Sequence, residues 1–133
     1  MSFEFPYRFL KFEDGGEVPY PIIIAKLNTT LGKQSYSFIL DTGADITTLP
    51  HYMISLLGMD KKRLEKSEST GIGGKTQTYN GKTDITIGKL TFSIPVVFVM
   101  NNAIPFLLGK EGIFDRFTIV LDNNRSRTVL HVR

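Results

Sequence analysis

Short apolar segments alternate with glycine-rich or polar stretches along most of the chain. This pattern is typical of β-strands joined by tight turns, so it predicts a mostly β structure. One apolar stretch, residues 90–100, fits either a strand pair or one long bent strand. The predicted strands are residues 6–12, 21–27, 35–41, 90–100, 105–109, 118–122 and 128–132.

Glycine-rich and polar stretches mark the expected turns. Gly15 and Gly16 in "EDGGE" are expected to supply positive φ angles. Residues 70–88 predict a hairpin with a glycine-rich tip. The stretch "NNRSR", residues 123–127, separates the last two strands and predicts a second hairpin.

One segment has helical periodicity. Residues 50–58, "PHYMISLLG", place four apolar side chains on one helix face, with Pro50 near the start and Gly58 at the C-cap. Those side chains are Tyr52, Met53, Leu56 and Leu57. Residues 59–69 are polar and predict a surface segment, and residues 110–117 allow about one helical turn.

Length and composition agree with a globular domain. A chain of 133 residues with 41% apolar and 22% charged residues predicts a single domain, residues 1–133, able to bury a core. The net charge of +3 is mild and no dense Lys/Arg block occurs, so we expect no nucleic-acid partner.

Cysteine and histidine usage narrows the chemistry. The chain has no cysteine, which excludes disulfides, thiolate catalysis and cysteine-based zinc sites. With only two histidines, His51 and His131, we expect no metal site, and we expect no cofactor. No signal-peptide core and no 18-residue apolar run is seen, so the expectation is a cytoplasmic protein without a membrane segment.

The strongest candidate for chemistry is "SFILDTGADITTLP", residues 37–50. The apolar residues 38–40 are followed by Asp41 and then by Thr-Gly, which predicts a turn, and Asp45 lies four residues after Asp41. Gly43 permits a sharp turn and close approach of a ligand to the backbone. The local pattern alone leaves two interpretations open, because Asp41 could be a functional acid or could simply cap the turn.

Three stretches in order carry a family resemblance. "DTGAD" after an apolar run resembles the active-site segment of retropepsin-like aspartic proteases. "GIGG", residues 71–74, resembles the flap tip of the retroviral enzymes, and "FLLG", residues 106–109, resembles the segment behind their catalytic loop. The later stretch "EGIFDRFTIVLD" is more similar to bacterial and archaeal members. From about residue 20 onward, the resemblance implies an all-β, closed β-barrel with one or two short helices.

The resemblance implies an aspartic endopeptidase acting on an extended peptide or protein substrate. That reaction needs two carboxylates sharing one proton, because like charges at short range cannot both ionise. One acid takes a proton from water and the other donates one to the scissile carbonyl. The chain has a single D-T-G, so the second acid is expected to be Asp41 of another copy in a homodimer.

The resemblance also implies roles for individual residues. Asp41, Thr42 and Gly43 would form the catalytic group, with Thr42 hydrogen-bonded across the two-fold axis. The implied substrate-binding residues are Gly43, Ala44, Asp45, Gly71, Ile72, Gly73 and Leu107. Plain structural roles remain open for several of these, because Asp45 could be a turn acid, the glycine tip a passive turn, and Leu107 a core residue.

Lys110 stands where the viral relatives carry an arginine. A lysine cannot reproduce the bidentate Arg–carboxylate fork. The sequence therefore leaves open whether an Asp45–Lys110 pair forms. The final hairpin, residues 118–133, is a candidate source of dimer-interface strands.

Two rival functions come from other classes. A retropepsin-like domain could dimerise or bind peptides without turnover, since fold does not fix function. A phosphatase-type aspartate nucleophile would need Mg²⁺ and a large parallel α/β sheet. The few helical segments disfavour the phosphatase, and Asp45 lies four positions after Asp41 rather than two.

Overall fold

The computed structural model describes residues 1–71 and 74–133. Two short helical segments lie among the strands, α1 (Met53–Leu56) and the 3₁₀ turn η1 (Lys61–Arg63). The strands are β1 (Ser2–Pro6), β2 (Arg8–Lys11), β3 (Glu17–Tyr20), β4 (Ile22–Thr29), β5 (Gly32–Leu40), β6 (Thr47–Pro50), β7 (Glu65–Gly71), β8 (Gly74–Ile87), β9 (Leu90–Val99), β10 (Phe106–Leu108), β11 (Phe117–Asp122) and β12 (Arg127–Val132).

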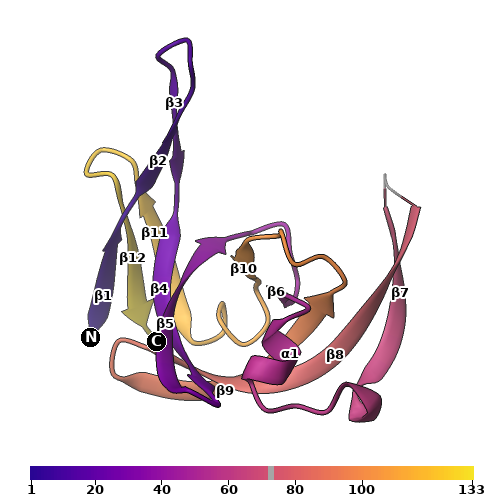
Figure 1. Ribbon diagram of the computed structural model, residues 1–133. Coiled ribbons are helices and arrows are strands. Elements are labelled where there is room, and N and C mark those ends of the chain that lie inside the picture. Colours follow the sequence, from indigo (N-terminus) through magenta and orange to yellow (C-terminus); the bar gives the residue numbers. More distant parts are fainter. Residues whose placement is uncertain (72–73) are drawn as a thin grey trace.

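The central sheet curls into a barrel-like ring (Figure 1). Its seven strands have the order β4-β5-β10-β6-β9-β8-β7, and β4 also pairs with β8. Two pairs are parallel, β5 with β10 and β6 with β9, and the other pairs are antiparallel. The predicted all-β class is confirmed.

The core follows the two-residue period of the strands. In β4, Ile23, Ala25 and Leu27 are buried, whereas Ile24 and Lys26 between them are exposed. Strand β9 alternates in the same way. Successive strand side chains point to opposite faces, so one face of each strand fills the ring. Each fully buried Ile or Leu contributes roughly 1.5–3 kcal/mol.

The two ends of the chain share a second sheet, of order β1-β12-β11. Strand β1 pairs antiparallel with β12, from Ser2 opposite His131 to Pro6 opposite Arg127. Strands β11 and β12 form the hairpin predicted for the C-terminal residues, which is confirmed. Phe117 and Leu130 from this sheet reach the main core cluster, so the two sheets enclose one hydrophobic interior.

The prediction for residues 6–12 was partly wrong. Residues 6–12 divide at Tyr7, because the chain pairs with β12 before this residue and with β3 after it. Residues 59–68 are exposed or half-buried, in agreement with the predicted surface segment, and they include η1 and part of β7. Strand β7 lies at the sheet edge, and its backbone pairing with β8 needs no apolar side chains.

The predicted helix is present but shorter than the pattern indicated. Helix α1 spans one turn, Met53–Leu56, because Pro50 still belongs to β6. Met53 and Ile54 are its buried residues, while Tyr52 is 42% exposed, so the predicted apolar face was wrong at that position. Gly58 has a φ of +72° and follows the helix as expected.

Smaller details of the turns also differ from prediction. Gly15 has a φ of +88°, but Gly16 does not adopt a positive φ. Gly16 instead accepts a hydrogen bond from the Phe12 N–H and donates its own N–H to the Asp14 carboxylate. Residues 90–99 form the single strand β9, and residues 111–116 form successive turns. In the described parts of the chain, no helix has the length and apolar character needed to span a membrane.

Candidate active site

The loop at residues 41–46 joins two strands that are not neighbours. Strand β10 lies between β5 and β6, parallel to β5 and antiparallel to β6. The loop must therefore cross the end of β10. Its first residue, Asp41, donates its backbone N–H to the Leu108 carbonyl at 3.0 Å. The core strands thus fix the position at which the acid leaves the sheet.

Hydrogen bonds inside the loop orient the Asp41 carboxylate. The Gly43 N–H donates to Asp41 Oδ1 at 3.0 Å, and the Ala44 N–H donates to the Asp41 carbonyl at 3.2 Å. The side chain is half-buried, while Thr42 and Gly43 are exposed. One carboxylate oxygen is therefore engaged by the turn that the Thr-Gly sequence forms, and the loop presents the acid at the surface.

Gly109 allows the chain to pass directly behind this loop. A Cβ at Gly109 would lie 2.7 Å from the Thr47 nitrogen and would also overlap the Ile46 backbone. The Gly109 N–H donates to Thr47 Oγ1 at 3.0 Å in a buried position. The glycine that ends "FLLG" is therefore required by space.

Two further backbone bonds tie the loop to the segment after Gly109. The Lys110 N–H donates to the Ala44 carbonyl at 3.0 Å, and the Glu111 N–H donates to the Asp45 carbonyl at 2.8 Å. Residues 41–47 are thus held from behind by three backbone–backbone hydrogen bonds to residues 108–111 and by the Gly109 bond to the Thr47 side chain. Such a preorganised backbone can hold an acid in one geometry.

The pair that the sequence left open is present. Lys110 Nζ lies 3.0 Å from Asp45 Oδ1. Both side chains are exposed, at 41% for Lys110 and 85% for Asp45. An exposed ion pair of this kind contributes little to stability. It instead holds the Asp45 carboxylate and a positive charge together beside the loop.

The structure brings some of the other predicted site residues together. Half-buried Leu107 lies in β10 opposite Ile39 of β5 and Thr48 of β6, directly below the loop. Gly71 ends β7 and pairs with Gly74 at the start of β8. This β7–β8 hairpin rises on the same side of the molecule as the loop (Figure 1). Ile72 and Gly73, predicted for its tip, lie outside the described residues.

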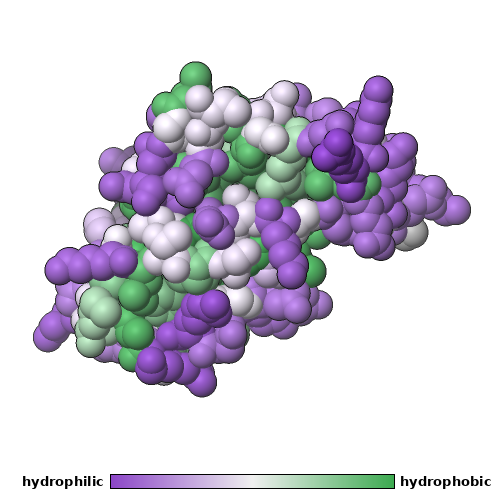
Figure 2. Space-filling model, turned by 90° about the horizontal axis from the view of Figure 1, so that it is seen from below, coloured by the Kyte–Doolittle hydropathy of each residue, from purple (hydrophilic) through white to green (hydrophobic). Residues whose placement is uncertain are grey.

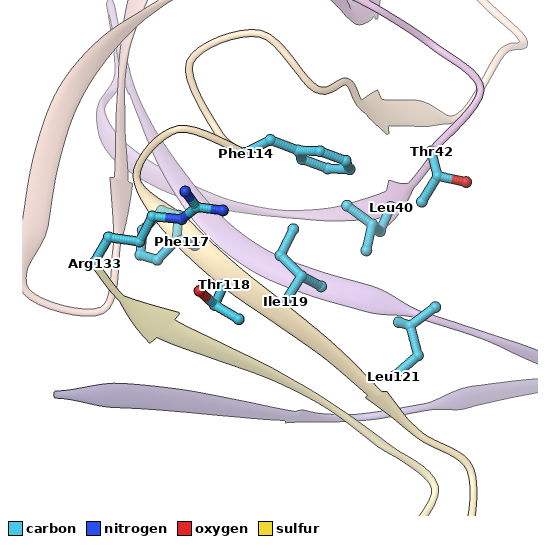
Figure 3. Close-up of a pocket in the computed structure, with 8 residues that line it drawn as sticks. All are labelled: Leu40, Thr42, Phe114, Phe117, Thr118, Ile119, Leu121 and Arg133. Carbon is cyan, nitrogen blue, oxygen red and sulfur yellow. The ribbon is translucent and has the colours of Figure 1, made fainter.

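An apolar hollow that the sequence analysis missed adjoins the loop. Its volume is about 360 Å³. Figure 3 shows Leu40, Phe114 and Ile119 gathered around it, with Thr42 on one side. Its lining residues are Leu40, Thr42, Phe114, Phe117, Thr118, Ile119, Leu121 and Arg133. The alternation of β11 could have indicated an apolar face, but not that it lies beside Thr42.

A second hollow lies around the Asp45–Lys110 pair. It has a volume of about 630 Å³ and contains apolar and charged side chains. Its lining residues are Asp45, Ile46, Lys110, Glu111, Gly112, Phe114 and Asp115. Phe114 lines both hollows. Across residues 1–71 and 74–133, no group of three or more His, Asp or Glu side chains is arranged to hold a metal ion.

Comparisons with known proteins agree with this geometry. A family model described as "Aspartyl protease" matches residues 27–111, about two thirds of the chain. The match includes Asp41 and the segments at residues 71–74 and 106–109. The comparison with curated protein sequences gives no match.

Solved structures show the same fold. One is a retropepsin-like aspartic protease from Rickettsia conorii, with a TM-score of 0.68, 19% identity and 98% of each chain covered. Another is the EIAV protease in complex with the inhibitor HBY-793, with a TM-score of 0.53 and 20% identity. The second match covers 76% of this chain and 88% of the viral one. At these identities the likeness shows the fold alone.

Proposed function

This chain belongs to the aspartyl protease family and has a retropepsin-like fold, and from that premise we propose a dimeric active site. In this proposal, two copies of the chain bring their Asp41 carboxylates together and hydrolyse an extended peptide. The observation that carries the proposal is the loop itself, which is fixed from behind by backbone bonds and presents Asp41, Thr42 and Gly43 at the surface.

The requirement for a second copy follows from the acids of this chain. Only Asp41 is followed by Thr-Gly. Asp45, the nearest other carboxylate in the sequence, is paired with Lys110. A two-fold axis beside the loop would place a second Asp41 against the first and would make one symmetric site.

The two carboxylates would share the work of one hydrolysis. Two like charges at short range do not both ionise, so the pair holds one proton and titrates as a unit. The ionised Asp41 takes a proton from a water lying between the two acids. The protonated Asp41 donates to the scissile carbonyl oxygen as the water oxygen bonds to the carbonyl carbon. Collapse of this intermediate breaks the C–N bond: the leaving nitrogen takes the proton that one Asp41 removed from water, and the other Asp41 regains a proton from a hydroxyl of the intermediate.

Neighbouring residues would position the acid and the substrate. The Gly43 N–H holds Asp41 Oδ1, while the Gly43 carbonyl faces the substrate backbone in this proposal. Ala44 and Leu107 would supply apolar contacts, and Asp45 would contact the substrate main chain while Lys110 holds its carboxylate. Apolar lining of this kind favours hydrophobic residues near the cut.

The hairpin of β7 and β8 is proposed as the flap. Its tip would include Gly71, Ile72 and Gly73, and it would close over the bound peptide. Closure over a substrate excludes bulk water from the reaction. Polar side chains along β7 suit a hairpin that spends part of its cycle in solvent.

Peptide-library cleavage tests the proposal. Wild type is compared with Asp41→Asn, and Asp84→Asn, an exposed aspartate in β8, is the matched control. We expect cleavage by wild type and the control, loss of cleavage in Asp41→Asn, inhibition by pepstatin-like compounds, and a rate that rises faster than linearly with protein concentration. Cleavage by Asp41→Asn at the wild-type rate would overturn the proposal. A wild-type dimer that binds peptides without cutting them would instead identify a catalytically silent binding domain.

A further inference from the structure

The hairpin of β2 and β3 projects from the body of the molecule (Figure 1). The two strands pair with each other and, among the described strands, with no other. Every residue from Arg8 to Pro19 is exposed. An isolated two-stranded ribbon is marginally stable in water, so packing against another surface would favour this hairpin, which we call the arm.

The arm carries more apolar surface than an isolated ribbon needs. Phe9, Leu10, Phe12 and Val18 are between 39% and 49% exposed. Leu10 lies opposite Val18, and Phe9 lies opposite Pro19. Since neighbouring residues in a strand point to opposite faces, both faces of the arm present apolar groups. Clustered exposed apolar residues of this kind mark contact surfaces.

Hydrogen bonds at both ends hold the arm in place. At its base, the Tyr7 N–H donates to the Ser126 carbonyl at 2.8 Å, and the Tyr7 hydroxyl donates to Asn123 Oδ1 at 2.9 Å. At its tip, the Gly16 N–H donates to Asp14 Oδ1 at 2.8 Å. The arm is therefore anchored to the β11–β12 turn at its base, while its tip is shaped by a hydrogen bond within its own turn.

The arm projects on the side on which a second copy would stand. In Figure 1, the arm, the β7–β8 hairpin and the loop after β5 all lie toward the top. A partner whose Asp41 meets this one would contact the molecule at the loop, on the side where the arm also projects. The β11 strand beside the arm also exposes Val120 and Leu121, at 41% and 47%. On the opposite side, Figure 2 shows hydrophobic residues in separate areas between hydrophilic ones.

We propose that the arm of each subunit packs against the second copy of the chain and strengthens the dimer that completes the active site. This inference rests on the dimeric function proposed above. The residues that make the contact are Phe9, Leu10, Phe12 and Val18. The contact is made twice in the dimer, once by each arm, because a two-fold axis repeats every contact.

The first test is the dimer dissociation constant, measured by sedimentation equilibrium. The variant Leu10→Glu/Val18→Glu places two like charges opposite each other on the arm. We expect its dissociation constant to rise by about tenfold or more, as for loss of apolar anchors at an interface. The control is Leu31→Glu, in the β4–β5 turn at the bottom of Figure 1, where Leu31 is 75% exposed. The control should dimerise like wild type.

A cross-linking experiment tests the same contact without relying on a destabilised variant. Because the chain has no cysteine, Phe12→Cys supplies a single attachment point for a thiol-directed photo-cross-linker. The protein is mixed with isotopically labelled protein of the same sequence. Cross-links joining labelled and unlabelled chains are the expected result. Cross-links found only within one chain would overturn the proposal.

The arm and the protease function can fail separately. If the protease proposal is right, the Leu10→Glu/Val18→Glu variant should regain wild-type activity per dimer once its concentration exceeds its raised dissociation constant. If wild type cleaves nothing, the sedimentation and cross-linking results still decide the arm. An unchanged dissociation constant would overturn the arm proposal. If the Leu10→Glu/Val18→Glu variant raises KM but dimerises like wild type, the arm contacts substrate rather than the second copy, and the arm proposal is also overturned.

Discussion

The loop that carries Asp41, residues 41–46, has two sides that are built in opposite ways. Behind it, Gly109 and Thr47 are buried and joined by a hydrogen bond at 3.0 Å, with no room for an added Cβ. In front of it, Thr42, Gly43 and Asp45 are exposed. The rear is determined by packing within one chain, whereas the front is exposed and is the side proposed to contact a partner subunit and a substrate. Substitutions on the two sides should therefore change different quantities.

The largest effect on folding is expected from Gly109→Ala behind the loop. The new methyl group would overlap the Ile46 backbone and lie 2.7 Å from the Thr47 nitrogen. Overpacking against backbone should lower the free energy of unfolding by roughly 3 kcal/mol. It should also displace Asp41 and abolish cleavage. Urea unfolding followed by circular dichroism measures the free energy of unfolding. Gly32→Ala is the comparison variant, because its added methyl group meets open space and only the φ of +99° is unfavourable. Equal stability of Gly109→Ala and wild type would contradict the packing argument.

A smaller effect is expected from Thr47→Val, also behind the loop. Valine keeps the shape of threonine but removes the Oγ1 that accepts from the Gly109 N–H. An unsatisfied buried donor costs about 1–3 kcal/mol, so the free energy of unfolding should fall by that amount. Thr48→Val is the matched control, because the Thr48 hydroxyl makes only a long 3.3 Å bond to the Ile46 carbonyl. A control that destabilises as much as Thr47→Val would show that the buried bond is not the cause.

On the front, Thr42→Ala should leave the folded subunit almost unchanged. Exposed substitutions usually alter stability by less than about 0.5 kcal/mol. If Thr42 contacts its counterpart across a two-fold axis, the dimer dissociation constant should rise by about tenfold. Thermal melting at low protein concentration and sedimentation at a series of concentrations separate the two quantities. If Thr42→Ala lowers the melting temperature of the monomer and leaves the dimer dissociation constant unchanged, Thr42 stabilises the fold of one subunit rather than the dimer.

The smallest effect on folding is expected from Asp45→Asn. The ion pair with Lys110 is exposed, so its loss should change the free energy of unfolding by about 0.5 kcal/mol or less. Added salt should shrink that difference further. KM for peptides should rise more than the stability falls, since Asp45 is proposed to contact substrate. Denaturation at two salt concentrations, with Lys110→Met as the paired variant, checks this. A large loss of stability would mean that the pair supports the fold.

The sequence was most informative about the loop and least informative about what surrounds it. Local chemistry made Asp41, Gly43 and the "FLLG" segment recognisable, because each depends on a few neighbouring residues. The insertion of β10 between β5 and β6 could not be derived in the same way. It depends on pairing between residues 68 positions apart for β5 and 59 positions apart for β6, and no local sequence period indicates such a pairing.

The misjudged elements fail for related reasons. Strand β1 was only partly anticipated, because its main partner is the last strand of the chain. Strand β7 is polar, since a hairpin at the edge of the sheet needs no buried face. Helix α1 is a single turn, which is too short for a 3.6-residue period to select the buried side chains. Phe114 lies beside the loop because residues 111–116 form turns, and turns have no sequence period from which its position could be predicted.

The pairing of β1 with β12 joins the two ends of the chain, with Ser2 opposite His131. This is close to the largest loop that 133 residues can close. Contacts of such sequence separation slow folding, because loop entropy is lost before the pairing compensates for it. During synthesis, β1 emerges more than a hundred residues before β12 and can pair with it only after β12 has emerged. Because Asn123 and Ser126 from the C-terminal hairpin anchor the base of the arm at Tyr7, that anchoring also comes late. If the arm supports the dimer as proposed, a chain that has not yet paired β1 with β12 would dimerise poorly, and its proteolytic activity would appear only near the end of folding.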